Sequence, residues 1–593
     1  MKNSVYSGSL FHSTMKQGFA VLLVSLLSAG YCFSQMPGDK IRLNQLGFYP
    51  NATKIAVVVD GESTDFNIRK AGSGKIVYSG TLGEPRKSDF SPRITRIADF
   101  SELKKKGSYI MEVPETGESF PFEIGASVLR DLSIGVIKGF YFQRMSTPLP
   151  GKYAGIWERE AGHPDTVVII HPSAASPGRP EGSFISSPKG WYDAGDYNKY
   201  VVNSGITMGT MLSAWEDFST YFAKLDLNIP ESSNKVPDLL DEILWNLRWM
   251  LTMQDPADGG VYNKVTAASF EDMIMPSMAV KPRYVVQKGT GATLSFAAVM
   301  AQASRIMSQF SQALPGLADS CLTAAEYAWV WARNNPGLAY NQNAMNKIHK
   351  PEISTGGYGD NNFSDEFIWA AAELFITTGN DTYYSSVRMM PDTLMPLPSW
   401  GNVRLLGYYS LARFNTKLKG VAATDFNEIE RRIIRSAEGL IKGTSEQPYN
   451  TVMGKSRRDF VWGSNSVAAN QGILLIQAYK LSGDRKFLEH ALANLDYLLG
   501  RNATGYSFVT GFGHKTPMFI HHRPSEADDI PEPVPGLLAG GPNPGRQDGC
   551  DYPSDIPDEA YSDSVCSYAS NEIAINWNAP LVYLVAAVEA LIR

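Results

Sequence analysis

The chain has 593 residues, of which 44% are hydrophobic and 19% charged, a balance typical of globular proteins and a length that indicates two or more domains. Its formal net charge is −6 and no dense basic run occurs, which argues against nucleic acid or an anionic membrane surface as the main partner. Aromatic residues reach 11%, a share that a large hydrophobic core explains and that sugar-binding clefts also use.

Residues 1–34 have the layout of a secretory signal peptide. After Met15, a lysine precedes the mostly apolar run Phe19–Leu27, and small residues follow it. The run is too short to span a bilayer, and cleavage is expected near Ser34–Gln35. A lipid anchor at Cys32 is disfavoured, because the large Tyr31 precedes it. We therefore expect export to the periplasm, the cell surface or the medium, with no membrane span.

Residues 38–126 have the pattern of short β-strands. Lys54–Val59 is a β-branched run, and apolar residues alternate on both sides of Ala71–Gly74, which predicts a hairpin. Short strands separated by turns over this length predict an immunoglobulin-like β-sandwich. No cluster of chemically active residues lies in this segment, so its predicted role is structural.

Residues 127–593 read as helical, because apolar residues recur there at the helical period. Acids and then spaced apolar residues follow Pro237, and Ser364–Gly379 runs from a capping residue to a terminating glycine. A pattern of hydroxyl residue, glycine and capping residue recurs between helical stretches, at Thr378–Asn380 and Ser482–Asp484. Such repetition is typical of stacked helical hairpins. Long loops at 171–190 and 524–556 interrupt the helices, and loops of that length are usually functional.

Cysteine usage is sparse. Cys32 leaves with the predicted signal peptide, and Cys321, Cys550 and Cys566 remain without any C-x-x-C spacing. A Cys550–Cys566 disulfide is one reading in an oxidising compartment. The spacing does not support a structural zinc site.

Three clusters of residues could carry chemistry. In Gly190–Tyr200, Asp193 and Asp196 flank Ala-Gly, so both carboxylates can point to one side of a turn and one can serve as a base. A capping turn or a calcium loop is the alternative. Ser507–Arg523 holds three of the eight histidines in a loop-like stretch. The third cluster, Tyr561–Glu572, leads into an apolar helix, where a glutamate can also be a simple dipole partner.

Together the clusters resemble the family 9 glycoside hydrolases, a cellulase family built on an (α/α)6 barrel. The D-A-G-D motif of that family corresponds to Asp193–Asp196, its histidine signature to Ser507–Arg523 and its acid signature to Tyr561–Ala579. Further matching segments lie at Gly259–Lys264 and Gly540–Asn543. The opening Ile41–Phe48 resembles the immunoglobulin-like module that often precedes these barrels. The resemblance covers nearly the whole mature chain and implies a sandwich at 38–126 followed by an all-α (α/α)6 barrel at 127–593.

The resemblance also implies a mechanism that inverts the anomeric carbon. Glu572 is then the acid and Asp196 the main base, with Asp193 holding the water. The two carboxyl groups are expected roughly 6.5–9.5 Å apart. Asp563 is expected to support Glu572 or its loop, and His521 and Arg523 to bind glucosyl hydroxyls. Further substrate contacts are expected from loop aromatics, for which core packing is the alternative: Trp191, Trp400, Trp462, Tyr552 and Tyr568.

The predicted activity is endo-hydrolysis of a β-1,4-glucan, with soluble xyloglucan or mixed-linkage glucan as the expected substrate. Small residues at Gly540–Gly541 and in 173–188 would leave room for branches. Two alternatives remain open: an exo-acting glucosidase or glucosaminidase of the same family, and a non-catalytic glycan-binding protein. A monomer is expected, with no cofactor and no metal, since no ligand set for a structural calcium stands out.

Overall fold

The structure is a computed structural model that describes residues 38, 40–416, 418 and 423–592. The predicted signal peptide, residues 1–34, lies outside these residues. In the described chain no helix combines the length and the apolar character needed to cross a bilayer.

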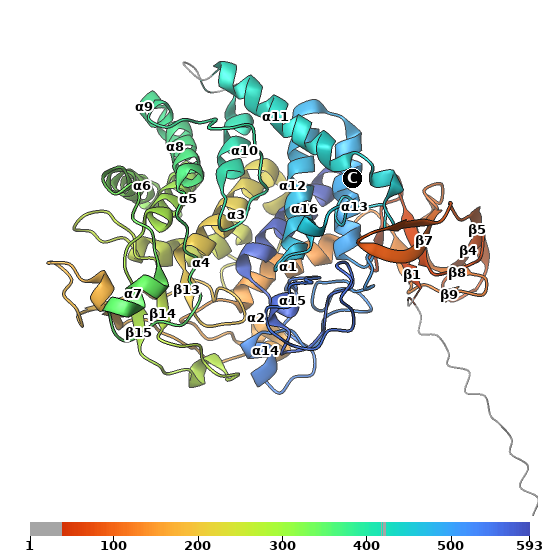
Figure 1. Cartoon of the computed structure of the whole chain (residues 1–593), viewed down its shortest axis with the longest axis horizontal. Helices are drawn as coiled ribbons and strands as arrows, with labels where there is room; N and C mark the ends of the chain where they lie inside the picture. Colours follow the sequence, from red (N-terminus) through yellow and green to blue (C-terminus); the bar gives the residue numbers. More distant parts are fainter. Residues whose placement is uncertain (1–37, 39, 417, 419–422, 593) are drawn as a thin grey trace, which may run out of the picture. The chain divides into compact units, whose positions relative to one another are not determined.

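Residues 41–124 form the predicted β-sandwich (Figure 1). One sheet has the strand order β1-β3-β7-β6, and the other has the order β2-β10-β8-β4-β5, with β9 paired to β8. The strands are β1 (Ile41–Arg42), β2 (Gly47–Phe48), β3 (Ile55–Val59), β4 (Asp65–Lys70), β5 (Ile76–Thr81), β6 (Arg86–Ser88), β7 (Ser91–Asp99), β8 (Gly107–Val113), β9 (Gly117–Glu118) and β10 (Phe122–Ile124). Strand β10 pairs in parallel with β2, and the other pairs are antiparallel.

The predicted hairpin is β4–β5. Its strands pair in antiparallel register, with Asn67 opposite Ser79. Gly72 and Gly74 have φ of +81° and +64° in the connecting turn, a region that glycine adopts without strain. The glycines in the sequence therefore located this turn correctly.

Strand β3 is buried on both of its faces. Ala56 and Val58 pack into the sandwich core, while Val57 packs with Tyr449 and Ala503 of the C-terminal region. A strand covered on both sides reads as a continuous apolar run rather than an alternating one. This explains the β-branched run in the sequence, and it shows that part of the second domain completes the environment of the first.

Helices dominate from residue 130 onward, as expected (Figure 1). The α-helices are α1 (Arg130–Phe142), α2 (Gly151–Ala154), α3 (Val201–Phe222), α4 (Asp238–Thr252), α5 (Thr290–Met307), α6 (Leu317–Asn334), α7 (Gln342–Ile348), α8 (Ser364–Thr378), α9 (Asp381–Ser385), α10 (Arg404–Phe414), α11 (Ala423–Ile441), α12 (Ser464–Ser482), α13 (Arg485–Leu498), α14 (Arg523–Ala527), α15 (Tyr568–Asn571) and α16 (Ile575–Leu591). Short 3₁₀ helices are η1 (Gly155–Trp157), η2 (Pro172–Ala174), η3 (Pro276–Met278), η4 (Ser308–Phe310), η5 (Thr444–Glu446) and η6 (Arg457–Asp459).

The long helices pack as a sequence of neighbours. Helix α16 contacts α3, α3 contacts α5, α5 contacts α8 and α8 contacts α10. These helices are buried along most of their length, as is α12, which contacts α16. Each packs against a partner helix: α3 with α4, α5 with α6, α8 with α9, α10 with α11, α12 with α13 and α16 with α1.

Two of the helix–helix junctions repeat in geometry as they do in sequence. Gly379 ends α8 with φ of +70°, and Gly483 ends α12 with φ of +71°. In each case the next residue caps the following helix, since the side chains of Asn380 and Asp484 accept hydrogen bonds from the backbones of α9 and α13. The predicted helical hairpins are confirmed at these positions.

A sheet within the helical region was not expected from the sequence. Its order is β12-β11-β15-β14-β13, and its strands are β11 (Val168–Ile170), β12 (Phe184–Ile185), β13 (Lys199–Tyr200), β14 (Lys264–Ala267) and β15 (Arg283–Val285). Strands of two to four residues are too short for alternation to be read in a sequence. Figure 1 shows β13–β15 on the same side of the molecule as α7, α14 and α15, where the long loops gather.

Candidate active site

The turn that carries Asp193 and Asp196 is closed tightly around Gly195. A Cβ atom on Gly195 would lie 2.1 Å from the carbonyl oxygen of His521, so only glycine allows the two segments to approach this closely. The carbonyl of Gly195 accepts hydrogen bonds from the backbone and the Nη1 of Arg523, at 3.2 and 2.7 Å. The aspartate turn and the histidine segment are therefore held in contact.

The two aspartates are buried and have different partners. Both oxygens of Asp193 accept from Asn203 Nδ2 at 3.0 Å, and Oδ2 also accepts from the Tyr358 hydroxyl at 2.9 Å. Asp196 Oδ2 accepts from Asn198 Nδ2 and, at 3.0 Å, from the Tyr200 hydroxyl. Burial, together with the charge of Asp196, raises the pKa of Asp193 well above its ordinary value.

Glu572 follows the short helix α15 in extended conformation and is bound to both other segments. Its residue forms a parallel β-bridge with His521, and Ala574 forms an antiparallel bridge with Ala194. The backbone N–H of Ile575 donates to the carbonyl of Asp193 at 2.8 Å. Three stretches that are far apart in sequence thus present their side chains to one place.

The environment of Glu572 favours its protonated form. Burial raises the pKa of this carboxyl well above its ordinary value, and the negative charges of Asp196 and Asp193 raise it further. The guanidinium of Arg523 acts in the opposite direction. A carboxylic acid that keeps its proton near neutral pH can donate it to a leaving group.

Of the three histidines in the second cluster, only His521 reaches the pocket. Its Nδ1 lies 2.7 Å from the carbonyl oxygen of Val565, so Nδ1 carries the proton and Nε2 is left as an acceptor. Burial lowers its pKa, which keeps the ring neutral near pH 7. His522 instead contacts Gln143 in the interior, and His514 lies against Phe120 of the sandwich.

Asp563 lies outside the pocket lining and acts on the backbone. It accepts hydrogen bonds from the N–H groups of Met518 and Phe519 at 2.9 Å each, and from Asn571 Nδ2 at 3.1 Å. These contacts connect the histidine segment to the residue that precedes Glu572. The expected support of the acid loop is consistent with this placement.

One pocket of about 530 Å³ collects these side chains. Asp193, Asp196, His521, Arg523 and Glu572 line it, together with the predicted substrate contacts Trp462 and Tyr568. The rings of Trp462 and Tyr568 lie 5.4 Å apart between centroids, and the Trp462 side chain is 43% exposed. An exposed Trp462 and a half-buried Tyr568 beside buried carboxyl groups suit a pyranose ring with its apolar face and its hydroxyls. The remaining lining residues are Ala194, Tyr200, Phe270, Ser354, Thr355, Gly356 and Tyr358.

Trp191 was wrongly predicted as a sugar contact. Its side chain is fully buried, its ring centroid lies 4.8 Å from that of Phe140, and its indole N–H donates to Glu242 Oε1 at 2.8 Å. Trp400 is 37% exposed and lies 5.5 Å from the Tyr358 ring, beside the pocket but outside its lining. Tyr552 donates its hydroxyl to Asp548 at 2.7 Å and also lies outside the lining.

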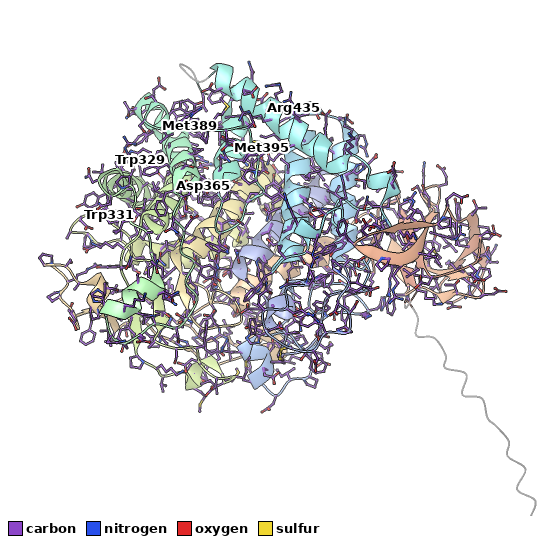
Figure 2. The ribbon with its side chains drawn as sticks, in the orientation of Figure 1. Trp329, Trp331, Asp365, Met389, Met395 and Arg435 are labelled. Carbon is purple, nitrogen blue, oxygen red and sulfur yellow. A yellow bond between two sulfur atoms is a disulfide. The ribbon has the colours of Figure 1, made fainter. Side chains whose placement is uncertain are left out.

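Other tryptophans lie on helices, as Figure 2 shows for Trp329 and Trp331 on α6. Both are 7% exposed, and Trp249 is fully buried. Trp245 is half-buried, with the guanidinium of Arg144 4.6 Å from its ring centroid. None of these four lines the active-site pocket in the described residues.

Gly540 and Gly541 do not widen the cleft as predicted. Both are buried, and their N–H groups donate to the carbonyls of Glu572 and Ser570 at 2.8 Å each. These two backbone hydrogen bonds hold the segment that carries Glu572 in place. Residues 178–180 and 183–186 of the other proposed opening line a separate pocket of about 650 Å³ that shares no lining residue with the active-site pocket.

Several pocket residues were missed from the sequence. Tyr200 ends the first cluster and could have been noticed there, because its spacing from Asp196 is local. Asn198 and Asn203 flank it and hydrogen-bond the two aspartates. Tyr358 comes from a loop 165 residues after Asp193, so no local pattern indicated it.

In the part of the chain that the structure describes, no group of three or more histidine, cysteine or acidic side chains is arranged to hold a metal ion. The predicted disulfide between Cys550 and Cys566 is present, and Cys321 is a buried free thiol. The disulfide closes the loop that contains Asp563.

Comparison with known proteins points to one family. Residues 131–585 match the family model described as glycosyl hydrolase family 9, and residues 36–118 match the cellulase N-terminal ig-like domain. A xyloglucan-specific endo-beta-1,4-glucanase from Bacteroides ovatus is 47% identical, with 94% of this chain and 95% of that protein covered. Endoglucanase D from Acetivibrio thermocellus is 34% identical, with coverages of 92% and 83%. A solved structure described as Bacteroides ovatus GH9 superimposes with a TM-score of 0.90 at 46% identity, covering 94% of this chain and 100% of that one.

Proposed function

The chain belongs to glycosyl hydrolase family 9 and is an endo-β-1,4-glucanase, and from this premise we propose that it inverts the anomeric carbon and that its substrate is a soluble, branched glucan of the xyloglucan type. The observation that carries the mechanism is the contrast within one pocket. Glu572 has a raised pKa, while Asp196 accepts hydrogen bonds from two donors, Asn198 and Tyr200.

The reaction needs an acid, a base and one water molecule. Glu572 donates its proton to the glycosidic oxygen as the bond from that oxygen to the anomeric carbon breaks. Water attacks the same carbon from the opposite face, and Asp196 takes the proton that the water gives up. A separation of roughly 6.5–9.5 Å between the two carboxyl groups leaves room for this water. The hydrolysis balances without a cofactor.

The neighbouring residues hold the participants in place. Asp193, fixed by Asn203 and Tyr358, shares the task of orienting the water. His521 accepts a glucosyl hydroxyl at Nε2, and Arg523 donates to another. Trp462 and Tyr568 supply the apolar surface on which a sugar ring stacks.

The substrate assignment rests on the relative from Bacteroides ovatus, which matches this chain over nearly its whole length and is named for xyloglucan. A polymer of this kind is met outside the cell, which supports the predicted export. Sequencing the N-terminus of the protein from cell fractions and from the medium tests the export and the cleavage near Ser34. We also propose that the enzyme is a monomer that does not bind nucleic acid, and gel filtration tests the monomer.

The fold proposal is more specific than an all-helical domain. Helices α3, α5, α8, α10, α12 and α16 form the inner ring of an (α/α)6 barrel, and their partners α4, α6, α9, α11, α13 and α1 form the outer ring. The contacts from α12 through α16, α3, α5 and α8 to α10 support five of the six junctions of the inner ring, and closure between α10 and α12 is part of the proposal. A crystal structure in which α12 does not lie between α10 and α16 would contradict it.

Viscometry of xyloglucan tests the activity. Endo-cleavage lowers the viscosity much faster than reducing ends accumulate, and the first products are long fragments. Mixed-linkage glucan and unbranched cellulose derivatives serve as comparison substrates. Strong activity on unbranched glucan with none on xyloglucan would make the chain a general endoglucanase. Release of only mono- or disaccharide from the earliest times would favour the exo-acting alternative, and no hydrolysis of any glucan would favour the non-catalytic one.

A further inference from the structure

A lysine buried behind the pocket wall is not explained by the acid–base pair. Lys264 begins β14, and none of its side chain is exposed to solvent. Its ammonium donates to neutral oxygens: Gln342 Oε1 at 2.7 Å, Thr355 Oγ1 at 2.9 Å and the carbonyl of Gly356 at 2.6 Å. Among the ion pairs of the described residues, none includes Lys264. Burial lowers the pKa of Lys264 to about 7, and the negative charge of Asp196 acts in the opposite direction. The side chain is therefore cationic on the acid side of neutrality, where a general base loses its activity.

One chain of hydrogen bonds leads from this ammonium to Asp196. Lys264 donates to Gln342 Oε1 at 2.7 Å, and Gln342 Nε2 donates to the carbonyl oxygen of Thr355 at 2.7 Å. That carbonyl shares its peptide group with the N–H of Gly356, which donates to the hydroxyl oxygen of Tyr200 at 3.1 Å. The Tyr200 hydroxyl in turn donates to Asp196 Oδ2 at 3.0 Å. Every donor in this chain points toward the carboxylate, so each bond polarises the next.

A second chain runs through side chains alone. Thr355, which accepts from Lys264, lies 2.6 Å from the hydroxyl of Thr266, and Thr266 donates to Asn198 Oδ1 at 2.9 Å. The Nδ2 of Asn198 then donates to Asp196 Oδ2. The backbone N–H of Ala267 also donates to Asn198 Oδ1 at 3.0 Å, which fixes the orientation of the amide.

Both chains end on the same oxygen. Among the hydrogen bonds between described side chains, those to the carboxylate of Asp196 reach Oδ2, which leaves Oδ1 as the oxygen that can take a proton from water. We propose that Lys264 is a positioning residue for the general base: through two hydrogen-bond chains it orients Asp196 and stabilises its carboxylate form. This inference rests on the proposed role of Asp196.

Other charges around Asp196 do not replace Lys264. Asp193 and Glu572 are acidic, so their negative charges oppose a second carboxylate. His521 is neutral near pH 7, because burial lowers its pKa. Arg523 binds the carbonyl of Gly195 on the opposite side of the turn. Arg283 reaches Asn198 at 3.3 Å, but its charge is paired with Asp165.

The test is the pH dependence of kcat/KM in Lys264→Met. A base must be deprotonated to act, so the acid limb of the profile reports its pKa. Loss of a cation and of the donors it polarises favours the protonated base, and the acid limb should move up by roughly one pH unit. At the optimum, kcat should fall about tenfold or more while KM changes by less than about threefold. Lys264→Arg, which keeps the charge, should recover part of the shift.

Lys54→Met is the matched control. Lys54 is equally buried, in the sandwich, and donates to the carbonyls of Pro50 and Ala52 at 2.9 and 2.8 Å, with no path to the pocket. It should lower the melting temperature and leave the acid limb in place. A folded Lys264→Met enzyme with the wild-type acid limb would overturn the inference.

If Lys264→Met does not fold, Thr355→Val breaks the second chain and should give a smaller upward shift of the same limb. An unshifted limb in folded Thr355→Val would then count against the inference. A wrong assignment of Asp196 as the general base would give a different result. In that case Asp196→Asn would keep near-native turnover, whatever the effect of the Lys264 variants.

Discussion

At the scale of single residues, the pocket contains two carboxyl groups that need opposite protonation states. Burial and the negative charges of the two nearby aspartates raise the pKa of Glu572 and so favour its protonated form. Asp196 is instead surrounded by donors, Tyr200 and Asn198. Environment rather than residue type therefore decides which group is the acid.

Glu572→Gln and Asp196→Asn should each lower kcat about a hundredfold to ten-thousandfold. Binding of soluble glucan should change little, because both groups act mainly in the transition state. Single-turnover rates and equilibrium binding to the inactive variants check this. Glu352→Gln, an exposed glutamate in a lysine pair, is the control. Near-native turnover in either variant would refute the role given to that residue.

Arg523→Gln should move the alkaline limb of the kcat profile to higher pH. The guanidinium favours the charged form of Glu572 and lowers its pKa, so its loss raises that pKa. An acid acts while protonated and fails as pH rises through its pKa, which gives the sign. KM should also rise, because Arg523 contacts the sugar in our proposal.

Kinetics between pH 5 and 9 provide the measurement. Arg546→Gln is the control, since Arg546 is paired with Asp555 outside the pocket. A shift of the alkaline limb to lower pH in Arg523→Gln would contradict the electrostatic account.

The sequence motifs correctly predicted which carboxyl groups line one pocket, and prediction failed where only packing decides. Asp193, Asp196 and Glu572 lie in motifs whose polar groups have few other uses together. Trp191 lies in the same motif, but a tryptophan there can face the pocket or the core, and it faces the core. Tyr358 reaches Asp193 from a distant loop, so only the folded chain reveals it.

At the scale of elements, regular helices and hairpins were predictable and the short strands were not. Terminating glycines and capping residues act locally, which is why α8 and α12 end where the sequence indicated. Strand β13 has two residues, and it pairs with a distant segment, Lys199 with Val265 and Tyr200 with Lys264 of β14. Long-range pairing of this kind leaves no periodic signal.

The disulfide between Cys550 and Cys566 constrains the loop that leads to Glu572. It joins residues 16 apart, and closing a loop of that size stabilises by about 3 kcal/mol in the chain-entropy model. Cys550→Ser/Cys566→Ser should therefore lower the melting temperature and shorten the half-life of activity on warming. Calorimetry and residual activity after heating measure both.

Cys321→Ala controls for the loss of a thiol without a disulfide. Reductant should lower the melting temperature of the wild-type enzyme and leave the double serine variant unaffected. Equal melting temperatures for the wild-type enzyme and the double variant would show that the bond contributes nothing.

At the scale of the whole molecule, the sandwich is bonded to the loop that leads into the active site. Gln45 Oε1 accepts from the backbone N–H groups of His514 and Lys515 at 2.7 and 2.9 Å, and its Nε2 donates to Gly505 at 2.9 Å. Asn44 Nδ2 donates to the buried Asp496 at 2.8 Å. The same loop continues to His521.

Gln45→Ala should destabilise the protein by about 2 kcal/mol or more, because it leaves buried backbone groups without partners. Activity should fall at temperatures below global unfolding, since the loosened loop carries His521. Denaturant unfolding and activity against temperature are the measurements. Asn67→Ala, which removes an exposed side-chain contact in the same sandwich, should be near neutral. An unchanged unfolding free energy for Gln45→Ala would show that the hydrogen bonds of Gln45 to this loop do not stabilise the protein.

The two-sided burial of β3 also constrains how such proteins can change over evolutionary time. Val57 must fit the surface made by Tyr449 and Ala503, while its neighbours Ala56 and Val58 must fit the sandwich. A sandwich transplanted from another lineage would meet an ill-fitting surface on the helical region. The two regions are therefore expected to be inherited as a pair and to accumulate compensating substitutions across β3. Recombination that separates them should be rare among descendants that keep the activity.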